Sequence, residues 1–139
     1  MATVYAQKKD EAKARANYED ARIRAESAVS ESPDDGPRHA LLGLIYAGLG
    51  RCEEAAAEGK RAVELLPETR DAFDGPILVI SRARITMMCG DFDTALALLD
   101  RSLQTPSGIT IYELRLDPVW DPLRSDLRFQ QMLTKFGAK

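Results

Sequence analysis

This sequence contains little cysteine and has no excess of positive charge. Each of these features excludes a class of protein. Only two cysteines, Cys52 and Cys89, occur among 139 residues, too few for a disulfide framework or a four-cysteine metal site. Lys and Arg number 19 against 22 Asp and Glu, for a formal net charge of −3. Bulk electrostatics therefore do not hold this chain on nucleic acid or on an anionic membrane, and we expect neither partner.

Long apolar runs and an N-terminal targeting signal are also missing. No apolar run reaches the ~18–20 residues that a membrane span needs. The first ten residues have no apolar core and no cleavage-type site of a signal peptide. We therefore expect a cytoplasmic location. The length of the chain predicts one domain over residues 1–139.

Proline and glycine are unevenly distributed, and they divide the chain into segments of helical length. Residues 2–32 contain neither, which predicts one long helix capped by Asp10 and ending near Ser30. Further helices are predicted over residues 37–50, 53–66, 77–89, 92–103, a short segment ending at 114, and about 126–135. The run Ile77–Ile80 has the β-branched residues of a buried strand, but the apolar pattern continues to Met88, which favours a helix. The sequence thus predicts an all-α fold.

Two segments of the chain repeat one pattern about 40 residues apart. In each, a helix ends in Gly and a polar turn follows. An Ala stands five residues after the Gly, and a small residue stands seven positions after that Ala. A Pro ends the unit. The paired positions are Gly50 and Gly90, Ala55 and Ala95, Ala62 and Ser102, and Pro67 and Pro106. Upstream, Tyr5, Ala14, Tyr18 and Ala21 fit the same template, with Lys9 in place of the turn Gly. Each unit is a pair of antiparallel helices, which pack closely where Gly43 faces the region of Ala55 and Ala62.

These residues resemble the tetratricopeptide repeat. The order and spacing of its consensus are matched by Leu42-Gly43, Tyr46, Gly50, Ala55, Ala62 and Pro67. His39 and Gly59 depart from it, each standing where the consensus has a large residue, so we expect Gly59 to tolerate a larger side chain. The resemblance covers residues 2–106 and is closest over 37–67. It implies a right-handed α–α superhelix with a partial first repeat (1–35), a best repeat (36–67), a degenerate third repeat (74–106) and a capping tail (108–139).

A narrower resemblance concerns the whole arrangement. Residues 42–67, 71–76, 116–123 and 128–129 are similar to the repeat-bearing C-terminal modules of bacterial multidomain signalling proteins. Such modules lie behind adenylate-cyclase-like, kinase-like or DNA-binding effector domains. The similarity implies that the chain is one part of a larger protein, and no effector activity carries over to these residues.

The chain offers no constellation of catalytic or metal-ligating residues. His39 is the only histidine. We interpret it as a packing residue at the start of a helix, with a general base as the alternative. Cys52 and Cys89 are interpreted as small buried apolar residues, with a redox pair as the alternative. A solvated helix face is predicted for Glu53, Glu54, Glu58, Lys60, Arg61 and Glu64. We expect no enzyme activity, no metal and no cofactor.

The family resemblance also implies a ligand groove on the inner, first-helix face. That face carries Ala40, Leu44, Ala47, Ile80, Arg84 and Met87. Chaperone-tail-binding members grip a carboxylate there with Lys, Asn and Arg, whereas this chain has Ala40 and Leu44 at the first such pair and Ile80 before Arg84, so we expect no carboxylate clamp. An apolar groove with Arg82 or Arg84 at its rim fits an amphipathic helix or the protein's own tail; the alternative is that the fold covers this face.

The predicted function is a non-enzymatic protein–protein interaction or scaffolding module with a protein or peptide partner. A homo-oligomerisation element that uses the exposed first-repeat face is the alternative, and a small-ligand-binding helical domain is the third reading. In the tail, we expect Trp120 and Phe129 to plug a cap over the third repeat. For Trp120, the only tryptophan, ligand stacking is the alternative.

Overall fold

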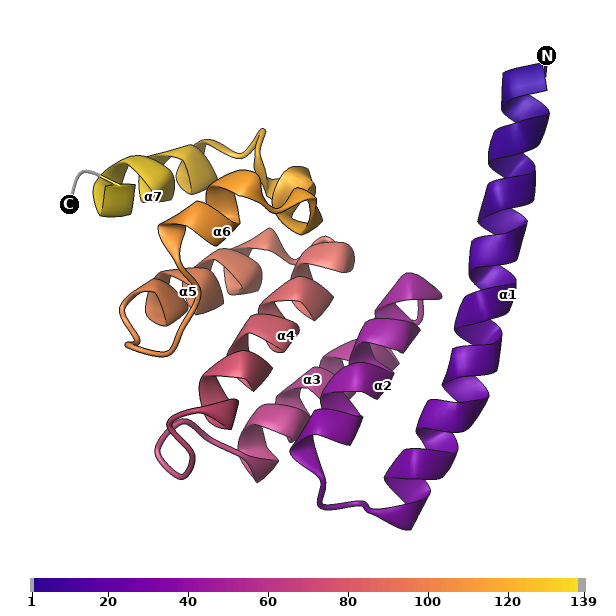
Figure 1. The fold of residues 1–139 in the computed structure, drawn as a ribbon, viewed down its shortest axis with the longest axis horizontal. Helices are drawn as coiled ribbons and strands as arrows, with labels where there is room; N and C mark the ends of the chain where they lie inside the picture. Colours follow the sequence, from indigo (N-terminus) through magenta and orange to yellow (C-terminus); the bar gives the residue numbers. More distant parts are fainter. Residues whose placement is uncertain (1, 138–139) are drawn as a thin grey trace.

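The computed structural model describes the backbone of residues 2–137 and the side chains of residues 8–137, and every regular element in these ranges is helical (Figure 1). The all-α prediction is confirmed, including a helix over the β-branched run at Ile77–Ile80. The elements are α1 (Ala2–Glu31), α2 (Gly36–Gly48), α3 (Cys52–Leu65), α4 (Asp74–Met88), α5 (Phe92–Leu103), α6 (Ile111–Leu116), the 3₁₀ helix η1 (Pro118–Leu123) and α7 (Leu127–Gly137).

Helix α1 begins earlier than predicted. Asp10 lies inside the helix, so it is not the N-cap. The segment is rich in Ala, Lys, Glu and Arg and contains no helix breaker, so nothing local stops the helix before Ala2. Pro33 follows its end at Glu31 as expected. None of the helices within residues 2–137 has both the length and the apolar character required to cross a membrane.

The two repeated glycines end their helices in the same way. Gly50 and Gly90 have φ angles of 78° and 80°, in the left-handed region that glycine adopts without strain. The N–H groups of the residues after them donate to carbonyls five residues back, Arg51 to Tyr46 (2.9 Å) and Asp91 to Thr86 (2.8 Å). These bonds are those of a Schellman motif, which turns the chain directly into the next helix.

Helices α2 and α3 form one hairpin, α4 and α5 form the next, and α4 packs against both α2 and α3 (Figure 1). The predicted close approach at Gly43 is confirmed, because a Cβ atom there would lie 3.3 Å from the carbonyl oxygen of Ala55. It would also lie 2.7 Å from the δ-methyl group of Ile85 on α4. Gly59 on α3 faces the same methyl group, so Ile85 packs against the two glycines.

The tail covers the end of the array, as predicted. Helix η1 contacts α4, and α7 contacts α5. Trp120 is only 2% exposed and Phe129 is fully buried, in one cluster with Leu96, Leu99 and Met87. The side chain of Thr110 caps α6 together with Glu113 in a capping box. This burial favours the packing role of Trp120 over the ligand-stacking alternative.

Cys52 and Cys89 form a disulfide, so their interpretation as two separate apolar residues was wrong. Cys52 is the first residue of α3, and Cys89 directly follows α4. Since α3 and α4 run antiparallel, the start of one lies beside the end of the other. The pairing follows from this geometry, although 37 residues separate the two cysteines.

Candidate functional site

The structure does not bring the six predicted groove residues together on one open surface. Ala40 is buried against Ala62 and Leu78, Ala47 belongs to the cluster between α1 and α2, and Met87 belongs to the C-terminal cluster. These three residues contribute to the core rather than to an open surface. Leu44, Ile80 and Arg84 remain partly exposed.

A hollow of about 920 Å³ lies elsewhere, between the first two helices, and we name it the α1–α2 groove. Its wall on α2 consists of Leu41 and Ile45. Leu41 is 56% exposed. The wall on α1 is formed by Ala14, Asn17, Tyr18, Asp20, Ala21, Arg24, Ala25 and Ala28.

The small residues of this groove correspond to residues that are covered elsewhere in the array. Ala14 and Ala21 precede Ala55 and Ala62 by one repeat. Ala55 and Ala62 are completely buried under α2, whereas Ala14 is exposed and Ala21 is half-buried. The first alanine pair thus has the spacing of a helix-packing site but no helix over it within the described residues.

The large residue on the opposite wall, Ile45, occupies an equivalent repeat position, although its own side chain is only 6% exposed. Ile45 stands one repeat before Ile85, and Ile85 packs against Gly43 of the preceding hairpin. In the array, α2 lies beside both α3 and α4. The corresponding position beside α1 and α2 is the α1–α2 groove, so the groove has the location that a helix occupies one repeat later.

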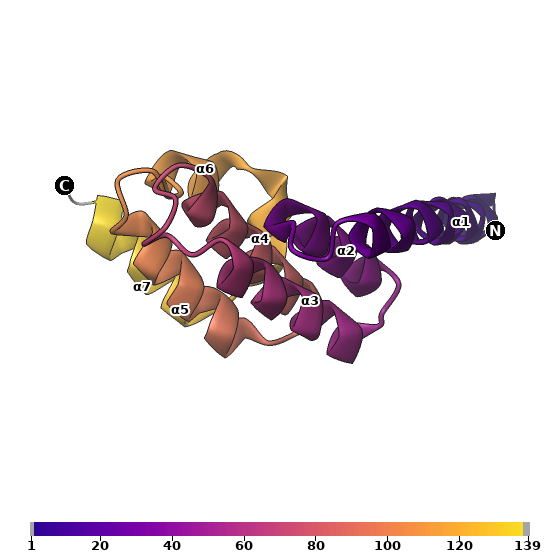
Figure 2. The same cartoon turned by 90° about the horizontal axis from the view of Figure 1, so that it is seen from below.

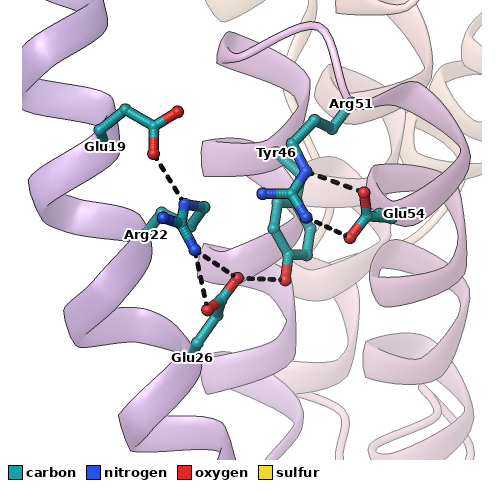
Figure 3. A network of polar contacts seen from close by, with 6 residues as sticks. All are labelled: Glu19, Arg22, Glu26, Tyr46, Arg51 and Glu54. Carbon is teal, nitrogen blue, oxygen red and sulfur yellow. Dashed lines mark hydrogen bonds and ion pairs between the residues drawn. The ribbon is translucent and has the colours of Figure 1, made fainter.

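A polar network on the other side of the α1–α2 contact holds the two helices together (Figure 3). The Tyr46 hydroxyl donates to Glu26 Oε1 (2.8 Å), and Arg22 binds both Glu26 (3.0 Å) and Glu19 (2.8 Å). The guanidinium of Arg51 lies 4.7 Å from the centre of the Tyr46 ring. The network ties α1 to α2 and to the turn before α3, so it fixes the width of the groove.

Burial and hydrogen bonding shift the pKa values of Tyr46 and Glu26 in opposite directions. Burial, with the hydrogen bond to Glu26 second, raises the pKa of Tyr46 to about 12. The hydrogen bond from Tyr46 is the main cause that lowers the pKa of the Glu26 carboxyl. At neutral pH the phenol is therefore a proton donor and Glu26 an ionised acceptor, which is the stronger form of this hydrogen bond.

His39 is a structural residue of the α2–α3 hairpin. It is buried, its Nε2 donates to the carbonyl oxygen of Pro33 (2.7 Å), and its Nδ1 contacts Glu58 Oε2. Both ring nitrogens are occupied, so none is free to accept a proton from an external substrate. Glu58 turns inward toward His39, which corrects its prediction as part of a solvated face.

The α1–α2 groove was not predicted, although the sequence contains a signal for it. Ala14, Tyr18 and Ala21 match the repeat template, and the α2 positions Leu41 and Ile45 are apolar.

Among the described residues, no three His, Cys, Asp or Glu side chains are grouped as metal ligands are. Comparisons with family models, with curated proteins and with solved structures found no match to this chain.

Proposed function

We propose that this chain is a tetratricopeptide-like array that works as a non-enzymatic protein–protein interaction module. Its binding surface is the α1–α2 groove, and the ligand is an amphipathic helix. One observation carries the proposal: Ala14 and Ala21 have the helix-packing spacing of Ala55 and Ala62 but lack a covering helix within the described residues.

The chemistry of the groove supports a helical ligand. Its floor is apolar and its alanines are small, so a second helix can approach closely, and its polar residues Asn17, Asp20 and Arg24 lie along one edge. This division into an apolar floor and a polar edge matches the two sides of an amphipathic helix.

The proposed setting is a scaffold in a larger bacterial signalling or regulatory protein. The cytoplasm remains the predicted location, and the Cys52–Cys89 disulfide makes that prediction testable. Cytoplasmic thiols keep most cysteine pairs reduced. Rapid alkylation of native cells, followed by a thiol count on the purified protein, should therefore find both cysteines reduced if the location is cytoplasmic.

Affinity capture from an extract of the native cells tests the interaction role. Leu41→Asp introduces a carboxylate into the groove, and Leu116→Asp makes the same change at a residue that is 77% exposed and outside the groove. We expect the wild type and Leu116→Asp to retain the same bound protein and Leu41→Asp to lose it. Equal capture by all three would contradict a role for the groove.

A further inference from the structure

We propose that the occupant of the α1–α2 groove is helix α1 of a second copy of this chain, packed antiparallel to the first about a two-fold axis. This inference rests on the proposed function, because it names the partner of the same groove. It follows from two observations: the length of α1 and the charge pattern along one of its faces.

Helix α1 is much longer than the surface that its own chain provides for it. It has 30 residues against 13 in α2, which corresponds to about 45 Å against about 20 Å at 1.5 Å per residue. Its N-terminal half extends past α2 and away from the other helices (Figures 1 and 2). Every side chain from residue 8 to residue 17 is exposed.

The N-terminal half of α1 gains stability from a partner. Most helical stability in proteins comes from packing, and the side chains of residues 8–17 have none within the described residues. In an antiparallel pair, the uncovered N-terminal half of each α1 lies along the C-terminal half of the other, beside the exposed Leu41. The N-terminal half of each α1 and the exposed Leu41 of the other copy are then covered together.

Charged residues on one face of α1 are arranged for this antiparallel pairing. The face that borders the groove carries Asp10, Lys13, Asn17, Asp20 and Arg24, at helical spacings of three and four. All five side chains are exposed, and within the described residues the four charged ones form no ion pair. They are therefore available to a partner.

Pairing about Asn17 brings opposite charges together. Asp10 stands seven residues before Asn17 and Arg24 seven residues after it, so an antiparallel copy places Asp10 against Arg24. Lys13 stands four residues before Asn17 and Asp20 three after it, so these opposite charges lie one residue out of register in the same pair. A parallel copy would place Asp against Asp and Arg against Arg, which is repulsive. The charge pattern thus selects the antiparallel arrangement.

The contact closes on two copies. Each chain contributes the same surface, so the interface is isologous and leaves no groove open for a third copy. The small side chains of Ala14, Ala21 and Ala28 allow the two α1 backbones to approach closely. The expected assembly is a dimer.

Sedimentation or light scattering over a range of concentrations measures the assembly. The wild type should reach twice the monomer mass of 15.4 kDa. Arg24→Asp places two carboxylates opposite each other, and Asp10→Arg places two guanidinium groups opposite each other. Each should raise the dimer dissociation constant roughly tenfold or more, because it brings like charges into contact across the interface.

The double variant Asp10→Arg/Arg24→Asp exchanges the two charges and should restore dimerisation. Arg15→Asp is the matched control: it makes the same charge change at an exposed residue, but on the other side of α1, and should leave the dissociation constant unchanged. Circular dichroism checks that all variants keep the wild-type helix content.

Three outcomes would overturn the inference: a wild type that is monomeric at every concentration, a dimer that tolerates Arg24→Asp, or a double variant that stays dissociated. The proposed function is judged separately. A monomer that captures another protein in a Leu41-dependent way refutes the second copy but retains the interaction role, whereas a monomer without such capture refutes both.

Discussion

At the scale of single residues, the contact between hairpins depends on Ile85 and the two glycines that it touches. A Cβ atom on Gly43 would lie 2.7 Å from the Ile85 δ-methyl group, and one on Gly59 would lie 3.1 Å from it. Gly59 is buried, and its Cβ would also lie 3.5 Å from Arg82 Cγ. The expectation that Gly59 accepts a large side chain is therefore wrong, because α4 fills the space.

Alanine at these two positions separates packing from helix propensity. Both substitutions gain up to about 1 kcal/mol of helix propensity. The new Cβ of Gly43→Ala must displace Ile85 further than the Cβ of Gly59→Ala does. It also approaches the Ala55 carbonyl oxygen, which Gly59→Ala does not. We expect Gly43→Ala to be less stable than Gly59→Ala by about 1–2 kcal/mol, measured by urea denaturation. Equal unfolding free energies would contradict this account of the contact.

Tyr46 links the polar network to the core, and Tyr46→Phe removes only its hydroxyl. The loss of a hydrogen bond to a charged acceptor should reduce stability by about 1–2 kcal/mol at neutral pH. Because the folded-state pKa of Glu26 is lowered, this contribution is complete above the ordinary Glu pKa and is lost as pH falls through the lowered value.

Urea denaturation of both proteins at several pH values checks this prediction. The stability difference between wild type and Tyr46→Phe should shrink as the solution becomes acidic. A difference that stays constant through the acidic range would show that Glu26 is not the relevant partner of the hydroxyl. Tyr112→Phe is the control, since Tyr112 is 69% exposed and should show no such dependence.

At the scale of elements, the disulfide joins the start of α3 to the end of α4 across 37 residues. Closing a loop of that length reduces the entropy of the unfolded chain and contributes up to about 4 kcal/mol in the chain-entropy model. We expect reduction to lower the midpoint of thermal unfolding without removing the helices.

Thermal unfolding with and without a thiol reductant, followed by circular dichroism, measures the effect. The double variant Cys52→Ser/Cys89→Ser should behave like the reduced wild type and should not respond to reductant. If the wild type melts at the same temperature in both conditions, the disulfide contributes nothing to the stability of the array.

At the scale of the whole molecule, the tail closes the C-terminal end of the array. Leu123 on η1 is fully buried in the cluster with Trp120 and Phe129, whereas Leu116 at the end of α6 is 77% exposed. Leu123→Ala should reduce stability by about 2–5 kcal/mol, and Leu116→Ala should change it little. Urea denaturation compares the two.

The fluorescence of Trp120 provides an independent readout of the same cap. With 2% of its surface exposed, it should emit well to the blue of tryptophan in water and shift to the red when the protein unfolds. Deletion of residues 116–139 should cause aggregation or unfolding, because it uncovers Leu99 and its neighbours. A soluble, stable deletion would contradict the capping role.

Most of the helices could be predicted from the sequence because their signals are local. Pro37 in the first turn of α2, Asp91 as the cap of α5 and the two turn glycines act within a few residues of their own position. The start of α1 was predicted wrongly because no local signal marks it. Asp10 is a residue type that caps helices, but the good helix formers before it let the helix begin at Ala2.

The candidate site was not predictable in this way, because it depends on which segments meet. The sequence by itself determined an all-helical chain with a repeat of about 40 residues and a tail that contains Trp120. Only the tertiary structure decided that Cys52 meets Cys89, that Glu58 turns to His39, and that Ala40 and Met87 are covered while the groove opens beside α1. The physical reason is that helix formation depends on neighbours along the chain, whereas burial and pairing depend on neighbours in space.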